Sequence, residues 1–480
     1  MPLNLTRGQQ LYRRARCRIP GGTQLLSKRP EMFLPDQWPA YYQKALGPYV
    51  WDIDGNRFLD MSLNGVGACV LGHADPEVNA AVHSAVDAGS MSTLNCPEEV
   101  ELAELLCELH PWADMARFVR TGGEALTVAV RIARARTGRD KIAFCGYHGW
   151  HDWYLSANLP NNAAGNAQTN SKMNARTSDC SSALSPALQK IQSETEQGNV
   201  LASHLLSGLD PAGVPRALAG HVLPFHYNQL DELKALAHTH RGELAAIVME
   251  PLRSQQPDPG FLEGVRQIAD DIGAALIFDE STVGFRLNTG GVHMTIGVAP
   301  DITIFAKAIS NGYAFAAVLG REEWMQAAQN TFISSTYWTE RIGPTAALAT
   351  IRKHRRENVP AHLGTIGSRV QEGWRTAAAE TGLRIAVSGI PPLSLLRFDY
   401  PYGQAVRTLF TQMLLDRGFL AGSAFYVTYA HQQEHIDAYL EALQEVFTLL
   451  APLLASANPM ESITAQLRGP VAHTDFQRLA

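Results

Sequence analysis

AALIFDESTVGFRLNTGGVHMTIGVAPDITIFAKAISNG, residues 274–312, is the stretch that decides the fold of this chain. A short apolar run, 274–278, ends in the acid pair Asp279-Glu280, and a second apolar run, 302–306, ends in Lys307. Short apolar runs bounded by turn residues are typical of buried parallel strands. The carboxyl ends of such strands form the edge at which α/β sheets bind ligands. The stretch therefore predicts an acid and an amine at one ligand-binding edge.

One carboxylate and one amine at strand ends suit a pyridoxal phosphate site. In such a site the amine, Lys307, forms a Schiff base, and the acid, Asp279, pairs with the protonated pyridine nitrogen. The plainer interpretation is that Lys307 is solvated and that Asp279 only caps a helix, as such residues often do. The choice between a cofactor site and this plainer interpretation depends on the other motifs of the chain.

Composition indicates an ordinary soluble globular protein: 480 residues, 46% hydrophobic, 18% charged, with a net charge of −6. That charge argues against a general affinity for nucleic acid. No apolar run approaches the roughly 18 residues that cross a bilayer. Six scattered cysteines without a CxxC pair argue against structural zinc and disulfides, and favour the reducing cytoplasm. The arginine-rich start is predicted to be an amphipathic helix ending before Ile19, and not a transit peptide or secretory signal.

Candidate strands alternate with candidate helices through the first two thirds of the chain, which predicts an α/β fold with a mostly parallel sheet. Asp54-Gly55 between alternating apolar residues predicts a β-hairpin. Beyond about residue 358 the pattern changes to a separate α+β lobe. Residues 158–199 are polar and aperiodic, which predicts an insertion near the site. The last residues, 458–480, are predicted to be a loosely attached tail.

Two local patterns supply further candidates. The strand 117–120 leads through Thr121-Gly122-Gly123-Glu124 into a helix, and a helix N-terminus with a glycine turn can bind phosphate. A simple tight turn is an equally good interpretation of these residues. Aromatic residues follow the strand 141–145 and could stack on a cofactor ring. The histidines among them match no standard metal-ligand spacing, so no metal site is predicted.

Several longer motifs occur together in one order along the chain: IPGG (19–22), VWDIDGNRFLD (50–60), VLGHADP (70–76), IARARTGRDKI (132–142), YHG (147–149), MEP (249–251), GFLEGVR (260–266) and FDESTVGFR (278–286). With these motifs the chain resembles the class III (ω-type) aminotransferases of the fold type I pyridoxal phosphate enzymes, and among them the glutamate-1-semialdehyde 2,1-aminomutases. The likeness covers about residues 19–447. It implies a large domain with a seven-stranded, mostly parallel sheet, a small α+β domain, and a homodimer with shared active sites.

The resemblance also implies a division of the chain. An N-terminal segment, 1–75, would belong to the small lobe. A cofactor-binding domain, 76–355, would carry a flexible insertion at about 158–200. The small domain with its tail would span 356–480.

The same resemblance implies roles for individual residues. Lys307 corresponds to the Schiff-base lysine and Asp279 to the partner of the ring nitrogen. Tyr147 corresponds to the aromatic residue stacked on the ring, with His148 beside it. Further residues are implied for the phosphate turn (Thr121, Gly122, Gly123), for a site carboxylate (Glu250), for phosphate contact from the partner subunit (Thr339, or else Thr336), and for substrate binding (Arg286, Arg341, Arg397, Glu340). A buried arginine could equally be a structural ion-pair partner.

The chain departs from the family pattern at three places: the first concerns cofactor binding, which backbone N–H groups still allow, and the other two concern the substrate pocket. The phosphate turn is Thr-Gly-Gly-Glu where the family usually has Ser-Gly-Thr-Glu. The residues after Lys307 lack the usual glycine run, and Glu340-Arg341-Ile342-Gly343-Pro344 replaces a Gly-Asn-Pro. These variants resemble homologues associated with bacterial surface-polysaccharide biosynthesis. The implied activity is amino transfer from an amino acid to a carbonyl acceptor through pyridoxal and pyridoxamine phosphate. An intramolecular aminomutase and a catalytically silent scaffold are the alternatives.

Overall fold

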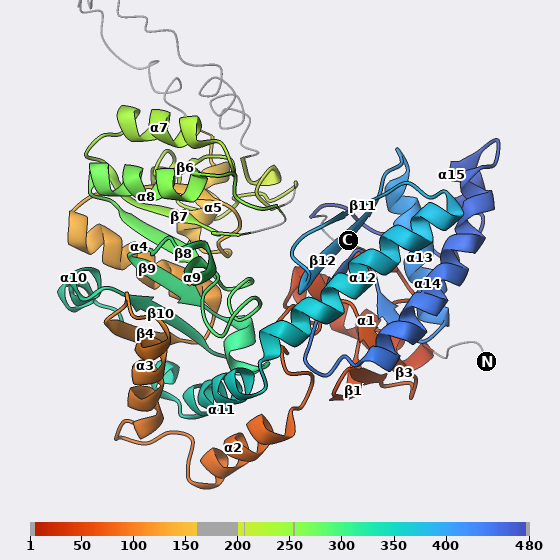
Figure 1. Cartoon of the computed structure of the whole chain (residues 1–480), viewed down its shortest axis with the longest axis horizontal. Helices are drawn as coiled ribbons and strands as arrows, with labels where there is room; N and C mark the ends of the chain where they lie inside the picture. Colours follow the sequence, from red (N-terminus) through yellow and green to blue (C-terminus); the bar gives the residue numbers. More distant parts are fainter. Residues whose placement is uncertain (1–4, 161–199, 206, 253–254, 477–480) are drawn as a thin grey trace, which may run out of the picture.

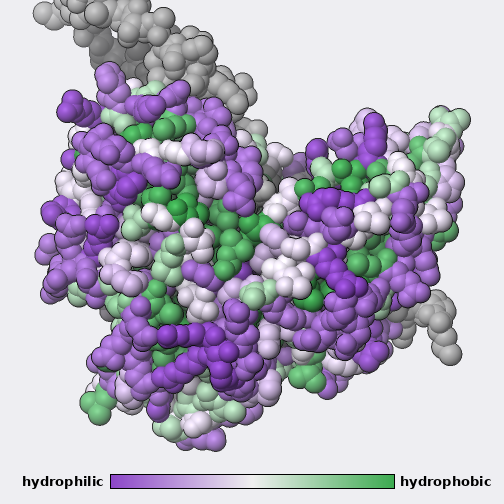
Figure 2. All heavy atoms as spheres, viewed as in Figure 1, coloured by the Kyte–Doolittle hydropathy of each residue, from purple (hydrophilic) through white to green (hydrophobic). Residues whose placement is uncertain are grey.

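The computed structural model describes residues 5–160, 200–205, 207–252 and 255–476. Figure 1 shows two lobes that the long helix α12 (Val359–Thr381) joins. The larger lobe, on the left, holds the main sheet, and the smaller lobe on the right holds both ends of the described chain. On the face drawn in Figure 2 hydrophilic residues dominate, and a notch separates the two lobes at the top of the view. The predicted insertion at about 158–200 lies almost wholly outside the described residues.

The main sheet has seven strands in the order β4-β10-β9-β8-β7-β5-β6. All neighbouring pairs are parallel except those of β10, which runs antiparallel to both β4 and β9. The predicted seven-stranded, mostly parallel sheet is therefore confirmed. Its strands are β4 (Met115–Val119), β5 (Lys141–Cys145), β6 (Val222–Pro224), β7 (Leu244–Met249), β8 (Ala275–Asp279), β9 (Ile302–Phe305) and β10 (Ala316–Gly320).

Helices cover both faces of the main sheet, which explains why its central strands are apolar throughout. Alternate strand residues, such as Val248 and Ile277, pack with α4 (Gly122–Thr137) on one face. Their neighbours, such as Met249 and Leu276, pack with α7 (Leu230–Thr239) and α8 (Phe261–Ile272) on the other. Strands buried on both faces leave polar residues only at their ends. The remaining helices of this lobe are α2 (Pro76–Asp87), α3 (Pro97–Leu109), α5 (Asp152–Leu155), α9 (His293–Ile296), α10 (Glu322–Met325) and α11 (Ile342–Arg356).

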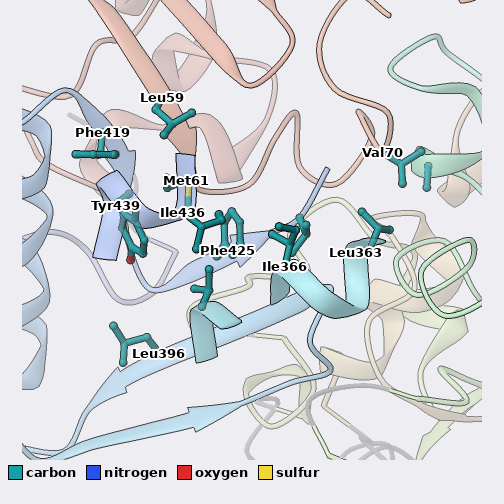
Figure 3. Close-up of a cluster of buried hydrophobic side chains, with 14 of the residues drawn as sticks. Leu59, Met61, Val70, Leu363, Ile366, Leu396, Phe419, Phe425, Ile436 and Tyr439 are labelled. Carbon is teal, nitrogen blue, oxygen red and sulfur yellow. The ribbon is translucent and has the colours of Figure 1, made fainter. Parts of the chain in front are cut away.

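The small lobe joins residues from both ends of the chain. The hairpin predicted at Asp54-Gly55 is present, and its second strand pairs in parallel with β13 from the C-terminal part. Figure 3 shows Leu59 and Met61 in the same apolar cluster as Phe419, Phe425 and Tyr439. The lobe consists of β1 (Tyr42–Leu46), β2 (Tyr49–Asp52), β3 (Arg57–Met61), β11 (Ile385–Ser388), β12 (Leu393–Phe398), β13 (Phe419–Ala421), β14 (Ala424–Tyr426), α1 (Thr6–Arg16), α13 (Gly403–Asp416), α14 (Gln433–Leu454) and α15 (Pro459–Thr464). The three-part division at 75 and 355 stays a prediction.

The prediction of a loosely attached C-terminal tail is wrong for its described part. Arg468 pairs with Asp416, and the backbone N–H of His473 donates to the Glu31 carbonyl. The N–H of Phe476 donates to Ser207. Since these partners are far away in sequence, local composition could not reveal the attachment. Among the described helices none is long and apolar enough to cross a membrane.

Candidate active site

Lys307 lies at the carboxyl end of β9, where it begins a short 3-10 turn. Its backbone is left-handed, with φ of 51°, a conformation that is uncommon outside glycine and often occurs at functional sites. Its Nζ donates a 2.6 Å hydrogen bond to Thr282 Oγ1. Burial lowers the pKa of the amine; the Arg286 charge lowers it further, while Asp279 and Glu250 oppose the shift. The lysine is thus held in a setting that favours its neutral, nucleophilic form.

A cavity of about 320 Å³, called the lysine cavity below, opens in front of this amine. Four of the predicted features line it: Lys307, Asp279, Tyr147 and the turn 121–123. They come from four separate segments of the chain that meet at the carboxyl edge of the main sheet. The other lining residues are Arg120, Leu126, Gly149, Trp150, Ser281, Thr282, Ala306, Tyr313, Ala314 and Phe315.

Asp279 is the last residue of β8 and is almost fully buried. Burial alone would raise the pKa of this carboxyl, but the hydrogen bond and charge of His148 and the Ser281 N–H outweigh it, so the pKa is lowered. His148 Nδ1 lies 2.9 Å from Asp279 Oδ2, and its Nε2 lies 3.1 Å from the Cys145 carbonyl oxygen. His148 thus bridges the Asp279 carboxylate and the end of strand β5. His148 therefore acts on the cavity through Asp279, whose charge it supports.

Glu280, the second acid of the pair, serves the fold. It is fully buried and accepts hydrogen bonds from the backbone N–H groups of Val292 and His293 and from the His293 ring. His293 Nε2 accepts a 2.7 Å bond from the Trp112 indole, which can only donate, so the histidine proton sits on Nδ1, facing Glu280. The strand end thus separates the two acids: Asp279 faces the cavity, and Glu280 anchors the loop 290–293.

The turn 121–123 is the N-terminus of α4 and has the geometry of an anion site. Thr121 and Glu124 form a capping box, in which the side chain and the N–H of Thr121 are both hydrogen-bonded to Glu124. The N–H groups of Gly122 and Gly123 have no hydrogen-bond acceptor in the described part of the chain. A Cβ at Gly122 would lie 2.9 Å from Ser281 Oγ, so only glycine lets the turn approach β8 this closely. The free N–H groups and the helix dipole favour a phosphate here.

Tyr147 and Glu250 lie on opposite sides of one turn. The Tyr147 side chain lines the lysine cavity, and its ring lies edge-on to Tyr154 at 6.0 Å. Glu250 lies outside the cavity lining and accepts a 3.3 Å bond from the Tyr147 N–H. A Cβ at Gly146 would lie 2.6 Å from the Glu250 carboxylate. In this chain Glu250 therefore holds the turn that carries Tyr147.

Four residues predicted from the family pattern cluster away from this chain's own cavity. Thr336 and Thr339 form an exposed 3-10 turn. Glu340 caps α11 through the N–H groups of Ile342 and Gly343 and pairs with Arg120 at 3.3 Å. Arg341 pairs with Glu98 at 2.6 Å. None of the four lines the lysine cavity.

The two other predicted arginines differ from each other. Arg286 is fully buried, and burial lowers the pKa of its guanidinium to about 10. It donates to the backbone carbonyls of Gly67 and Thr282, and it has no acidic partner within the described residues. Arg397 is exposed on β12 beside Asp399 and does not line the lysine cavity. Arg286 thus lies near the lysine, whereas Arg397 does not reach it within one chain.

The structure adds residues that sequence reasoning missed. Thr282 accepts the lysine bond, and Ser281 places a buried hydroxyl without a well-formed partner beside Gly122. Arg120 lines the cavity directly before the anion turn. Ser281 and Thr282 follow Asp279 in the strand-end position that marked the acid, so their position was a usable signal. Arg120 ends a predicted strand and gave no such signal.

An amine, a buried carboxylate, an aromatic side chain and an anion-binding turn around one cavity can hold a phosphorylated aromatic aldehyde. The two free N–H groups of the turn and the Ser281 hydroxyl supply donors that a phosphate would satisfy. The residues therefore fit the expected cofactor, pyridoxal phosphate. Among the described residues no group of three or more metal-ligating side chains is present.

Comparison with known proteins gives a consistent result. A family model described as Aminotransferase class-III matches residues 35–447. A 3-aminobutyryl-CoA aminotransferase from Cloacimonas acidaminovorans (strain Evry) is 30% identical in an alignment 456 residues long, which covers 92% of this chain and 97% of that protein. The PLP-bearing FumI protein of Sphingopyxis sp. MTA144 has a TM-score of 0.79 at 24% identity and covers 95% of this chain and 100% of its own. A glutamate-1-semialdehyde-aminomutase from Pseudomonas aeruginosa PAO1 has a TM-score of 0.72 at 22% identity, covering 92% and 94%.

Proposed function

The chain belongs to the class III aminotransferases and is a pyridoxal-phosphate-dependent enzyme, and from this premise we propose that Lys307 bonds the cofactor while an amino group passes from an amino acid to a carbonyl acceptor. One observation carries the proposal: the Lys307 amine, the Asp279 carboxylate and the open N–H groups of Gly122 and Gly123 line a single cavity. That convergence also argues against a catalytically silent scaffold.

When bound, pyridoxal phosphate withdraws electrons from the substrate carbon that loses a proton. Asp279 would face the ring nitrogen and keep it protonated; a unit-charge pair about 4 Å apart is worth roughly 4 kcal/mol at an effective dielectric near 20. The turn 121–123 and Ser281 would bind the phosphate. Tyr147 would cover one face of the ring, and His148 would hold Asp279 ionised through the 2.9 Å contact between them.

Lys307 would serve as the proton carrier once the amino donor has replaced it. Burial lowers the pKa of its amine, so the neutral form that accepts a proton is populated closer to neutral pH. Thr282 would hold the released amine through the 2.6 Å bond. The two half-reactions leave the cofactor alternately as pyridoxal and pyridoxamine phosphate.

The proposal also names candidate classes for the amino donor and the carbonyl acceptor. The relative that acts on 3-aminobutyryl-CoA makes a 3-amino acyl compound one candidate donor. The Thr121-Gly122-Gly123-Glu124 turn supports an acceptor from surface-polysaccharide biosynthesis. Arg286, which has no acidic partner among the described residues, is the candidate for binding a substrate carboxylate, whereas Arg120 pairs with Glu340 and Arg341 pairs with Glu98. A glutamate-1-semialdehyde aminomutase is the second candidate activity.

Spectra of the purified protein test the proposal. We expect absorbance from bound cofactor that borohydride changes irreversibly, and we expect Lys307→Ala to lose covalent attachment while it still binds the cofactor. The pyridoxamine form is then mixed with a panel of carbonyl acceptors. Turnover of glutamate 1-semialdehyde alone would identify an aminomutase. A colourless protein that gains nothing from added pyridoxal phosphate would refute the cofactor roles.

We propose further that the active enzyme is a cytoplasmic homodimer in which the partner's Thr339, or else the partner's Thr336, completes the phosphate site. In one chain these residues are exposed and do not line the lysine cavity. Large apolar side chains beside them are exposed as well, Phe332 at 83% and Tyr337 at 70%, which favours a protein partner on this surface. The five cysteines of the described chain are free thiols, in keeping with a reducing compartment.

Subunit mixing tests the shared site. Lys307→Ala and a Thr336→Val/Thr339→Val double variant are each expected to be nearly inactive alone. A mixed dimer carries one site with intact Lys307 and the partner's intact threonines, so it should have half of the wild-type activity. Random exchange of equal amounts makes half of the dimers mixed, so about a quarter of the wild-type activity should return. Mixing that restores nothing, although light scattering shows dimers, would exclude the threonine contact.

A further inference from the structure

A second cavity of about 530 Å³ lies beside the lysine cavity, between the N-terminal segment and the sheet β1-β2-β3-β13. Gly312 lines this second cavity, whereas its neighbour Tyr313 lines the lysine cavity. At Gly312 the backbone is left-handed, and an added Cβ would lie 3.2 Å from Cys69 Sγ, which lines the second cavity too. The turn that follows Lys307 therefore contributes neighbouring residues to both cavities.

The walls of the second cavity combine aromatic rings with hydroxyl groups. Such rings offer apolar faces and, in tyrosine, a polar tip, and hydroxyls both donate and accept hydrogen bonds. A cavity of this size suits a ligand body larger than a small amino acid side chain. The aromatic residues are Tyr12, Phe33, Trp38, Tyr41, Tyr42 and Phe58, and the aliphatic hydroxyls belong to Thr23, Ser27 and Ser62.

The two buried carboxylates of the second cavity have partners within the protein. Asp52 accepts hydrogen bonds from the N–H groups of Asp54 and Asn56. Asp60 lies 3.3 Å from His73. Burial alone would lower the pKa of His73, but its contacts with Asp60 and Cys69 raise it to about 10, which favours the charged form beside the Asp60 carboxylate.

No cation in this lining is free to receive a buried carboxylate. Lys28 is the only lysine or arginine among the described lining residues, and it is exposed to solvent. Burial of an unpaired carboxylate is strongly unfavourable, whereas burial of a hydroxyl with a partner is close to neutral. The lining therefore discriminates against an acidic ligand and accepts an uncharged, hydrogen-bonding one.

We propose that the second cavity binds the part of the carbonyl substrate remote from the reacting carbon, and that this part is an uncharged chain or ring bearing hydroxyl groups. The inference rests on the proposed function, because Lys307 defines where the reacting carbon lies. It deepens that function by naming the substrate class: a hydroxylated carbonyl compound and not a dicarboxylate. The two cavities together would hold the whole substrate around the turn at Gly312.

Three acceptors of equal chain length test the end group directly. Hexanal, 6-hydroxyhexanal and 6-oxohexanoate differ only in ending in a methyl, a hydroxyl or a carboxylate. Each is mixed with the pyridoxamine form, and the rate of its conversion is followed against acceptor concentration. We expect the apparent second-order rate constant of 6-hydroxyhexanal to exceed that of 6-oxohexanoate by at least tenfold. Equal rate constants, or a preference for the carboxylate, would overturn the proposal.

A variant that fills the second cavity supplies the structural control. Ser27 lines the cavity and makes no hydrogen bond in the described structure, so Ser27→Trp adds bulk without removing a contact, and Ser27→Ala is the matched control. Ser27→Trp should lower the rate constant of 6-hydroxyhexanal at least tenfold and leave that of propanal unchanged. An equal loss for both acceptors would contradict the assignment. Thermal unfolding of the three proteins identifies a variant that fails to fold.

Direct binding separates this inference from the proposed function. Saturation-transfer NMR with 1,6-hexanediol, on protein with and without cofactor, reports contact without any reaction. We expect a signal in wild type that is weaker in Ser27→Ala, which lacks one lining hydroxyl, and lost in Ser27→Trp. If Ser27→Trp loses the signal and no protein converts any aldehyde, the amino-transfer proposal is refuted but the cavity assignment is supported. An absent signal, or one unchanged in Ser27→Trp, would refute the cavity assignment even if aldehydes react.

Discussion

The hydrogen bond between Lys307 and Thr282 makes the sharpest prediction about the site. Thr282→Val keeps the side-chain shape and removes the only oxygen that accepts from Lys307 Nζ in the described structure. A hydrogen bond made by a charged group contributes about 1.5–3 kcal/mol. Because this acceptor stabilises the ammonium, its loss should lower the pKa of Lys307 by a further 1–2 units, at about 1.4 kcal/mol per unit. Burial has already lowered this pKa, so the two effects add in the same direction.

The assay is the pH dependence of the half-reaction from the pyridoxamine form, in which the Lys307 amine is free under the proposed function. The lysine must be unprotonated to accept a proton, so the rate rises with pH through its pKa. In Thr282→Val this rising limb should move to lower pH by about one unit or more. Thr282→Ser restores an acceptor and should return the limb to its wild-type position. A limb that stays in place in Thr282→Val, or that moves equally in Thr282→Ser, would refute the reasoning.

Three further predictions follow from other contacts. Asp279→Asn should retain the cofactor and reduce the half-reaction rate roughly a thousandfold, the equivalent of about 4 kcal/mol. An unchanged rate would contradict the proposed role of Asp279 beside the ring nitrogen. Gly122→Ala places a Cβ 2.9 Å from Ser281 Oγ and should weaken cofactor affinity about tenfold, measured by fluorescence titration, and an unchanged affinity would contradict the close approach. Burial lowers the pKa of His110, His354 and His431 to about 4, so the unfolded chain takes up protons first as the pH falls below 6.5. Each histidine should then remove up to about 3 kcal/mol of unfolding free energy by pH 4, and an unfolding midpoint in urea that does not change between pH 7 and pH 5 would contradict this.

Much of the large lobe could be predicted because burial leaves a strong local signal. Central strands covered on both faces are apolar along their whole length, so β7, β8 and β9 stand out between turns. β10 was not predicted, since its alanine-rich run, Ala316–Gly320, gives no strand pattern of its own and gains its place by pairing with β4 and β9. The prediction for the tail is wrong for the same reason, because several of its partners lie hundreds of positions away.

The candidate site, too, could be predicted only in part. Lys307, Asp279 and the turn 121–123 are found from local patterns because each ends a strand or begins a helix. Contacts that decide what each group does are long-range and were out of reach. Composition could not reveal that Glu280 would anchor the loop 290–293 while Asp279 faces the cavity. Nor could it show that Arg120 would pair with Glu340, 220 residues later.

Strand register explains why the acid and the amine of residues 274–312 reach one cavity. β8 and β9 are parallel neighbours in which Asp279 lies opposite Ile304, so the acid sits at the sheet edge while Lys307 lies three residues further on. The left-handed backbone at Lys307 turns the chain away from the direction of β9. Asn311 fixes the turn that follows: its side chain accepts a hydrogen bond from the Leu71 N–H and donates one to the Gly72 carbonyl. A shift of the register by two residues would carry the lysine about 7 Å along the strand, away from the Asp279 charge. Under the proposed function, the spacing between the two apolar runs and the turn that clamps the lysine would therefore serve catalysis as well as the fold.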